Sequence, residues 1–498
     1  MKTGLLGKVV LVLLLLRLVA LMLCETNGAA SLVIHIRADG EVDPSYVPIT
    51  RFDNYYRFDD NISGAIVVER SDAVIDGGGH CLVGSGQGTG FYFLEVSNIT
   101  LENVEIQNFE NGVFLYEAYN LSFLECLTKE NLFGFKVVSS SQVGVLKCNV
   151  SNNEFGLSLQ NCSEINIFNN SIMQNSLHGI YSYFSSFSSV CNNSITGNQR
   201  GIYFDFSSNN EVVGNNIVGN SYKGVRIAYS NNNLISGNNI SANQYGFWFF
   251  SASFNRFLEN YLAFNDKVGL YIEINSSSNS FFENVIMANS EIGLFVDSSS
   301  DNVFLHNNFL MNGENVIFKE QNCSNYWDDD VEGNFWDDYS GVDLNRDGIG
   351  DDSYIIDAWN LDGKPLMGFF NRFEIGSGYC VNVISNSTVE NFVFFEANGT
   401  MRFEVLGNDG FGFCRVMVPR MMVNSAGLFV VIDNGETLVL FPNYEVYSNA
   451  TYFWIYFAYE TGFHEVQILD EYPVWFGLLF FMLFVLVCTK MMSKICPK

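Results

Sequence analysis

Residues 201–224, GIYFDFSSNNEVVGNNIVGNSYKG, contain the pattern that decides the fold. The segment begins with a glycine and a short alternating apolar stretch, continues through Ser and Asn into further short apolar pieces, and ends on another glycine. Such alternation is typical of β-strands, and clusters of Asn, Ser and Gly are typical of turns. Because no apolar pattern of helical length occurs here, the segment predicts short strands joined by tight bends.

The same pattern recurs along the chain in steps of 22 to 24 residues. The glycines that mark it are Gly90, Gly112, Gly134, Gly156, Gly179, Gly201, Gly224, Gly246, Gly269 and Gly293. A second series in the same phase is Cys126, Cys148, Asn170, Asn193, Asn215, Asn238, Asn260, Asn284 and Asn307. One repeat of this length fits three strands and three bends, which stack at about 4.8 Å. The repeat therefore predicts an all-β, right-handed, single-stranded parallel β-helix with 22–24 residues per coil.

Composition changes divide the chain into seven expected segments. These are a signal peptide (1–30), an N-terminal cap (31–78), the β-helix (79–318), a Trp/Asp-rich closing segment (319–368), a β-sandwich stalk domain (369–471), a transmembrane helix (474–490) and a cytosolic tail (491–498). Lys2 and Lys8 precede an apolar stretch that ends in small residues, which is typical of a secretory signal; an uncleaved anchor is the alternative. Lysines follow the second apolar segment, so the positive-inside rule places the C-terminus in the cytosol.

The formal net charge of −29 limits the partners that we expect. A strongly acidic surface disfavours nucleic acid and anionic lipid, and it suits cation binding or an exposed, soluble position. N-x-S/T sequons such as those at Asn61, Asn98 and Asn120 agree with export and glycosylation. We therefore expect a single-pass protein at the cell surface, with an extracellular N-terminal region. The sequence does not define its oligomeric state.

Export permits disulfide bonds, and two pairs of cysteines are candidates. Cys126 and Cys148 occupy equivalent positions on adjacent rungs, so their Cα atoms would lie about 5 Å apart, within the range for a disulfide. A ladder of buried thiols is the alternative for this pair. Cys380 and Cys414 share the expected β-sandwich and form the second candidate pair.

The closing segment contains a possible calcium loop of the form D-x-N-x-D-G-x-G-D. Its first part matches the EF-hand pattern of oxygen ligands. The expected ligands are Asp343, Asn345, Asp347, the carbonyl of Ile349, and Asp351. Position 12 is Tyr354 rather than Glu, so the bidentate ligand is missing or comes from Asp352 or Asp357. A hydrogen-bonded acidic turn without a metal ion is the alternative.

The close of the helix region also carries a family resemblance. Gly333-Asn-Phe-Trp-Asp-Asp-Tyr339 and Asp347-Gly-Ile-Gly-Asp-Asp352, together with the glycine-rich entry at Asp76 and the Asn/Gly rungs, resemble the NosD-type right-handed β-helix family, especially its archaeal cell-surface members. The resemblance covers roughly residues 31–367. It implies copper handling, and related domains imply carbohydrate binding or sugar hydrolysis. Copper sites need convergent His, Cys or Met, whereas the five histidines here are scattered, so we do not expect copper.

The strand after each ladder glycine should turn every second side chain outward, and these positions combine aromatic rings with acids. Aromatic faces beside carboxylates suit sugars, which have apolar faces and polar edges. The candidate glycan-binding residues are Tyr181, Tyr183, Tyr203, Asp205, Trp248, Tyr271, Glu273 and Asp297. The alternative is that aromatic residues are common on sheet surfaces because they favour strands.

Two charged sets on this face bear on catalysis. Glu273 and Asp297 should lie on adjacent rungs about 5 Å apart, the spacing of a retaining glycosidase. His178, Arg200 and Lys223 should stack in one row, either as a contact for acidic sugar or as halves of surface ion pairs. Neither set forms a recognised catalytic motif. We therefore expect a non-catalytic glycan-binding or display protein; the alternatives are an anchored polysaccharide lyase or glycoside hydrolase, and a structural envelope component.

Overall fold

A computed structural model describes residues 32–469 except 321–322, 377, 408–409, 424–427, 434–436, 440–443 and 461. The expected signal peptide and the expected transmembrane helix at 474–490 lie outside the described residues. Among the described residues, no helix is long and apolar enough to span a bilayer. The chain forms two compact units. The first extends to Val303 and includes Met311–Asn325, and the second combines Phe304–Leu310 with the chain from Tyr326 onward.

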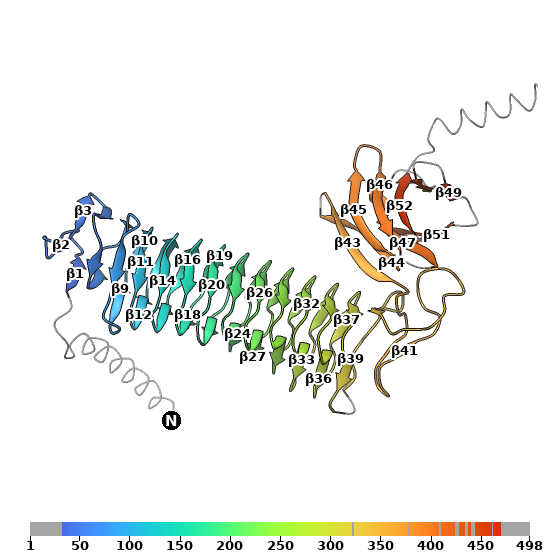
Figure 1. Ribbon diagram of the computed structural model, residues 1–498, viewed down its shortest axis with the longest axis horizontal. Coiled ribbons are helices and arrows are strands. Elements are labelled where there is room, and N and C mark those ends of the chain that lie inside the picture. Colours follow the sequence, from blue (N-terminus) through green and yellow to red (C-terminus); the bar gives the residue numbers. More distant parts are fainter. Residues whose placement is uncertain are drawn as a thin grey trace, which may run out of the picture. The chain divides into compact units, whose positions relative to one another are not determined.

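The first unit is a right-handed parallel β-helix, which confirms the fold predicted from the repeat (Figure 1). Its largest sheet has 14 strands. In spatial order these are β2 (Val42–Asp43), β1 (Val33–Ile36), β6 (Ala65–Val68), β9 (Thr89–Leu94), β12 (Asn111–Tyr116), β15 (Phe133–Val138), β18 (Phe155–Gln160), β21 (His178–Tyr183), β24 (Arg200–Asp205), β27 (Lys223–Ala228), β30 (Tyr245–Phe250), β33 (Val268–Glu273), β36 (Ile292–Asp297) and β39 (Glu314–Phe318). Apart from β2, all neighbours pair in parallel.

Two further sheets complete each rung. One contains β3 (Ile49–Phe52), β4 (Tyr55–Phe58), β7 (Ala73–Asp76), β10 (Ser97–Glu102), β13 (Tyr119–Leu124), β16 (Ser141–Leu146), β19 (Asn166–Phe168), β22 (Ser189–Cys191), β25 (Glu211–Val213), β28 (Leu234–Ser236), β31 (Arg256–Leu258) and β34 (Ser280–Phe282). The other contains β5 (Ile62–Ser63), β8 (Cys81–Val83), β11 (Glu105–Gln107), β14 (Leu127–Lys129), β17 (Asn149–Ser151), β20 (Ser171–Met173), β23 (Ser194–Thr196), β26 (Asn216–Val218), β29 (Asn239–Ser241), β32 (Tyr261–Ala263) and β35 (Val285–Met287). β37 (Val303–Leu305) begins in the first unit and ends in the second.

The ladder glycines are required by the close approach of successive rungs. A Cβ atom on Gly201 would lie 2.5 Å from the carbonyl oxygen of Gly224 and 2.9 Å from a methyl carbon of Ile217. Atoms this close overlap, so a side chain here would force the rungs apart. Apolar side chains such as Ile202 and Ile217 fill the interior and are fully buried.

Buried asparagines connect the rungs at three positions, one of which the sequence analysis identified. The predicted series from Asn170 onward is confirmed: Asn193 Oδ1 accepts hydrogen bonds from the backbone N–H and the side-chain amide of Asn170, both at 2.9 Å. A second series comprises Asn131, Asn153, Asn175, Asn198, Asn220, Asn243, Asn265, Asn289 and Asn312. A third comprises Asn210, Asn233, Asn255, Asn279, Asn302 and Asn325. These ladders satisfy backbone groups that the bends would otherwise bury without partners.

The cysteine pairs differ from the expected disulfides. Cys126 and Cys148 lie on adjacent rungs as buried thiols rather than as a disulfide. Their sulfur atoms approach backbone carbonyl oxygens, Cys148 Sγ lying 3.4 Å from the oxygen of Leu146. The Cys380–Cys414 pairing is wrong, because Cys414 lies opposite Ser385 in the paired strands. Cys380 is five residues away along that strand, a separation of about 17 Å, well beyond disulfide range.

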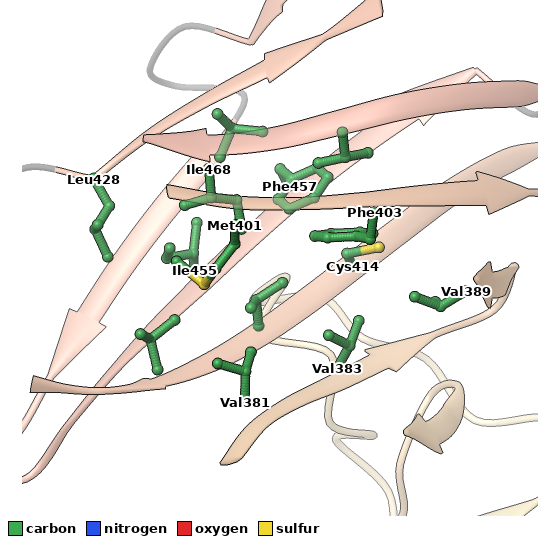
Figure 2. Close-up of a cluster of buried hydrophobic side chains, with 14 of the residues drawn as sticks. Val381, Val383, Val389, Met401, Phe403, Cys414, Leu428, Ile455, Phe457 and Ile468 are labelled. Carbon is green, nitrogen blue, oxygen red and sulfur yellow. The ribbon is translucent and has the colours of Figure 1, made fainter. Parts of the chain in front are cut away.

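The second unit contains an all-β domain built from two five-stranded antiparallel sheets. One sheet has the order β43 (Phe369–Ile375), β44 (Tyr379–Ser385), β47 (Phe411–Pro419), β51 (Tyr452–Glu460) and β50 (Tyr444–Ser448). The other has the order β45 (Thr388–Phe395), β46 (Thr400–Leu406), β52 (Phe463–Leu469), β48 (Phe429–Ile432) and β49 (Thr437–Val439), and a short 3-10 helix, η1, spans Arg420–Met422. Side chains of both sheets, among them Val383, Phe403 and Phe457, share one core (Figure 2).

The Trp/Asp-rich segment of the second unit encloses two buried tryptophans. Strand β38 (Asn308–Leu310) precedes the segment, whose own strands are β40 (Phe335–Trp336), β41 (Tyr354–Ile355) and β42 (Leu361–Asp362). Trp336 stacks on Phe309 with ring centroids 4.4 Å apart, and Trp327 stacks on Phe304 at the same distance. The indole N–H of Trp336 donates to Asp362 at 2.9 Å. The motif that carries the family resemblance is therefore a packing element.

Candidate functional site: the outward face of the 14-stranded sheet

The 14-stranded sheet brings together the outward residues predicted from the repeat. Residues at the second position after each ladder glycine pair in register from β21 to β36. They are Tyr181, Tyr203, Arg226, Trp248, Tyr271 and Phe295. Residues two positions further along each strand form a second column. It includes Tyr183 and Asp205 on adjacent rungs, and Glu273 and Asp297 on two other adjacent rungs. The first column is half-buried, as expected of side chains that lie against their neighbours along the helix axis.

The aromatic rings do not present their faces as the sequence analysis expected. The rings of Trp248 and Tyr271 are stacked, with centroids 4.2 Å apart and planes 18° apart. Tyr271 stacks in turn on Phe295 at 4.6 Å. Because rungs repeat at a spacing close to that of stacked rings, Trp248, Tyr271 and Phe295 cover each other's faces. The rings of Tyr181 and Tyr203 are instead tilted by 50°. The surface therefore offers ring edges and polar groups, and contact with a sugar would rely on hydrogen bonds and charge more than on ring stacking.

A row of three basic residues crosses the same face. His178, Arg200 and Lys223 pair in register on β21, β24 and β27, as predicted. His178 is buried among aromatic rings, and this burial, together with the charge of Arg200, lowers the pKa of His178 to about 3. Its ring is therefore neutral near pH 7. The Lys223 ammonium lies 3.4 Å from the centroid of the Trp248 ring.

Arg226 lies three residues after Lys223 on the same strand, within the column of mostly aromatic residues. Its guanidinium donates a hydrogen bond to the hydroxyl of Tyr203 and lies over the rings of Tyr203 and Phe250. Asp205, on the neighbouring rung, has its pKa raised by burial, although the charge of Arg226 opposes the shift. Cations, phenol hydroxyls and a carboxylate thus lie together between β21 and β30.

Glu273 and Asp297 are in register on adjacent rungs, but each carboxylate is already engaged. Glu273 accepts a hydrogen bond of 2.8 Å from the indole N–H of Trp248. Asp297 accepts from Lys319 at 2.8 Å and from the hydroxyl of Ser298 at the same distance. Burial raises the pKa of Asp297, but these hydrogen bonds outweigh it and the pKa lies below its usual value. A general acid needs the opposite shift, so the geometry does not favour this pair as glycosidase carboxylates.

An exposed aromatic column lies one position beyond Tyr183 and was not identified from the sequence. Phe184 stacks on Phe206 at 5.0 Å, and Phe206 stacks on Tyr229 at 4.7 Å. All three have positive φ values, an uncommon backbone region for bulky residues. Their spacing of 22 and 23 residues, in phase with the glycines, is the signal that would have located them.

The candidate calcium loop is held by hydrogen bonds within itself. The carboxylate of Asp343 accepts from the backbone N–H groups of Asp347 (3.1 Å) and Gly348 (2.9 Å), and Asp351 accepts from Leu344 (2.6 Å). Burial raises the pKa of Asp343 despite these hydrogen bonds. Gly348 has a φ of 81°, the left-handed conformation that favours glycine at this position. Asn345 also lies in the loop, where its amide approaches Asp347.

The donor set does not suit copper. In the described ranges, no three His, Cys, Asp or Glu side chains lie close enough together to hold a metal ion. His35 pairs with Glu69, His306 with a buried glutamate and His464 with Asp433, so these imidazoles occupy separate places. Copper needs several nitrogen or sulfur donors that converge on one point.

The chain matches the family described as "Periplasmic copper-binding protein (NosD)" over residues 62–220, 137–267 and 263–341. Among solved structures, a mannuronan C-5 epimerase A-module of Azotobacter vinelandii is 15% identical, with a TM-score of 0.46, and the match covers 55% of this chain and 88% of that one. A mutant of the periplasmic alginate epimerase AlgG is 14% identical, with a TM-score of 0.46, covering 56% and 78%. No curated protein matches the chain in sequence. Likeness at this level does not identify an activity.

Proposed function

The chain belongs to the NosD family, and we propose that this member binds polysaccharide along the outward face of its 14-stranded sheet, without cleaving it. One observation carries the proposal: Tyr203, Arg226, Trp248 and Tyr271 occupy consecutive rungs in register. The rungs of a β-helix repeat at about 4.8 Å, which is comparable to the length of one sugar residue in an extended chain. A polysaccharide that lies along the helix axis would therefore meet a new hydrogen-bonding side chain at each sugar.

Phenol hydroxyls, a guanidinium and carboxylates are suited to sugar hydroxyl groups, which both donate and accept hydrogen bonds. The edges of the stacked rings add apolar contact beside these groups. Binding without cleavage is favoured because Glu273 and Asp297 are engaged by Trp248 and Lys319. A lyase or glycoside hydrolase on the same face is the alternative function.

We expect the full chain to retain at least one polysaccharide from an array of neutral and acidic glycans, and Trp248→Ala to reduce retention about tenfold or more. The alanine leaves Glu273 without its indole donor and exposes one face of Tyr271, so both polar and apolar contacts change. Tyr119→Ala, at an exposed ring on β13 in another sheet, is the control and should not alter retention.

The same array distinguishes the alternatives when released product is also scored. Retention without product supports binding. Product release that Glu273→Gln abolishes would replace the proposal with an enzyme. Neither retention nor product on any glycan would leave a structural envelope protein.

We further propose that Asp343, Asn345, Asp347, the carbonyl of Ile349, and Asp351 bind calcium with a structural role. The order of oxygen ligands supports this, as does the position of Gly348 at the sixth residue. In the structure the three carboxylates do not converge on one point and instead accept hydrogen bonds within the loop, so calcium binding would rearrange it. We expect calcium to raise the melting temperature of the chain relative to a chelator, because an ion that binds only the folded state stabilises it. Asp347→Asn should remove the difference. An equal melting temperature in calcium and chelator would show that internal hydrogen bonds suffice for the loop.

We also propose that the protein is exported and anchored in a membrane. The apolar segments at 1–30 and 474–490 support a signal peptide and a single membrane span, with the β-helix displayed at the cell surface and residues 369–471 as the stalk domain. In that position the outward face of the 14-stranded sheet would be accessible to extracellular glycan.

A further inference from the structure

Three cations on the glycan-binding face have no carboxylate partner, although the chain is strongly acidic. Elsewhere on the helix, Lys129 pairs with Glu105 at 2.7 Å and Lys319 with Asp297 at 2.8 Å. Over the described part of the chain, Arg200, Lys223 and Arg226 have no carboxylate oxygen within the 4.0 Å limit of an ion pair. The alternative that Arg200 and Lys223, in the row with His178, form halves of surface ion pairs is therefore not met.

Lys223 is buried in an unfavourable environment for a cation. Its side chain is 7% exposed and lies between the rings of Tyr222 and Trp248. Burial, together with the like charges of Arg226 and Arg200, lowers the pKa of Lys223 to about 7, although the charge of Glu273 opposes the shift. Aromatic contact compensates a buried ammonium only in part. An apolar residue of similar shape would pack here at a lower cost in free energy. A functional role would explain why the position holds a lysine.

Buried polar atoms without hydrogen-bond partners mark the same place. Considering the described residues only, they include His178 Nδ1, Arg226 Nε and Asp205 Oδ1. His178 is 6% exposed, and no group among the described residues forms a hydrogen bond with its Nδ1 atom. Unsatisfied buried groups are rare and call for a specific cause, such as a ligand that completes them.

We propose that Arg200, Lys223 and Arg226 form a binding site for the anionic groups of an acidic polysaccharide, either carboxylates of uronic acid units or sulfate esters. The proposal rests on the proposed function, since it names the class of glycan that the same face would bind. A bound anion would pair with the three cations and relieve their mutual repulsion. Neighbouring phenol hydroxyls would bind the sugar itself.

The net charge of −29 does not exclude this ligand. Charges separated by more than about 8–10 Å are screened at physiological ionic strength, whereas the three cations act at contact. The acidic background would instead disfavour polyanions everywhere else on the surface, and so restrict them to this site.

The test measures binding of the full chain to polygalacturonate, dextran sulfate and neutral dextran at pH 6. We expect at least one of the two acidic polymers to bind ~10-fold or more tightly than dextran, and Lys223→Met to remove that preference. The two acidic polymers separate carboxylate from sulfate as the recognised group.

Lys136→Met is the matched control. Lys136 lies outward on this sheet, four rungs away from Lys223, with its ammonium over the rings of Phe114 and Phe133. Its binding should equal that of the unmodified chain.

A pH series separates the charge of Lys223 from its shape. The groups that face it are Arg200, Arg226 and Glu273, with the rings of Tyr222 and Trp248. Affinity for the acidic polymer should fall as pH rises from 6 to 9, because Lys223 loses its proton in this range. Lys223→Arg stays charged and should abolish the fall while retaining binding at pH 6.

Equal binding of acidic and neutral polymers would overturn the anion site and leave polysaccharide binding intact. Unchanged affinity in Lys223→Met would overturn the site in the same way. If no polymer in this set or in the wider array binds, both proposals fail together. A melting temperature for each variant excludes misfolding as the cause of any loss.

Discussion

Replacing Glu332 with alanine should lower the free energy of unfolding of the second unit by about 3–5 kcal/mol, the largest effect that we expect from one side chain. Glu332 is 4% exposed and lies between the basic side chains of His306 and Arg415. Its carboxylate accepts from His306 at 2.9 Å and from Arg415 at 2.9 and 3.0 Å. The substitution leaves Arg415 buried without its counter-charge, and an unpaired buried cation is far more costly than a lost surface contact.

Denaturant unfolding of the full chain, followed by circular dichroism, measures this effect. Glu374→Ala is the control, because Glu374 is an exposed acid on β43 of the same unit, and it should change stability by less than about 0.5 kcal/mol. A similarly small change in Glu332→Ala would contradict the account of a paired, buried charge.

The same carboxylate should make the second unit sensitive to acid in a defined range. Burial raises the pKa of Glu332, but the hydrogen bond from His306 and the charge of Arg415 outweigh it and hold the pKa at about 2. The pKa of an unfolded glutamate is about 4.3. Because the folded value is the lower one, the carboxylate stabilises the fold above about pH 4.3, and this contribution is lost as pH falls toward 2. The stability difference between the unmodified chain and Glu332→Gln should therefore narrow over that range.

The second large effect concerns the asparagine ladder of the first unit. We expect Asn193→Ala to lower the free energy of unfolding by about 3 kcal/mol or more. The side chain of Asn193 accepts from the backbone N–H of Asn170 at 2.9 Å, and its amide donates to the carbonyl of Ile167 at 2.8 Å and to Asn215 at 3.0 Å. Alanine leaves these buried groups without partners, and it leaves a void too small to be well hydrated.

Thermal unfolding and hydrogen exchange of the Asn170 amide measure this result. Asn166→Ala provides the comparison, since Asn166 is an exposed asparagine on β19, and we expect it to leave both quantities almost unchanged. Equal melting temperatures for the two variants would mean that the ladder contributes little to stability.

The fold could be predicted because the physical constraint that imposes it is periodic. Successive rungs approach so closely at Gly201 and its equivalents that only glycine fits, and this need recurs at every turn. The buried asparagines follow for a similar reason. The ladder through Asn198 and Asn220 was missed although its signal was present in the sequence. Each member from Asn131 to Asn289 precedes a ladder glycine by three or four residues.

The features that could not be predicted depend on side-chain orientation or on strand pairing that does not repeat along the sequence. The outward positions of Trp248 and Tyr271 follow from alternation, but the mutual stacking of their rings depends on side-chain rotamers. The prediction of a Cys380–Cys414 disulfide was wrong because the register of antiparallel strands does not appear in the sequence as a repeating spacing. The row through Lys223 was visible as a spacing, whereas the burial of Lys223, and the lack of an ion pair to it within the described residues, emerge only from the packed structure.

The central claim is that polysaccharide binds along the outward face of the 14-stranded sheet, and hydroxyl-radical footprinting tests it most directly. The full chain is oxidised with and without a polysaccharide that it retains, and the loss of oxidation is mapped by residue. We predict protection of Tyr181, Tyr203, Trp248 and Tyr271, with no change at Phe52, an exposed ring on β3 in another sheet. Protection confined to other surfaces, with these four aromatic residues oxidised as in the free chain, would contradict the account.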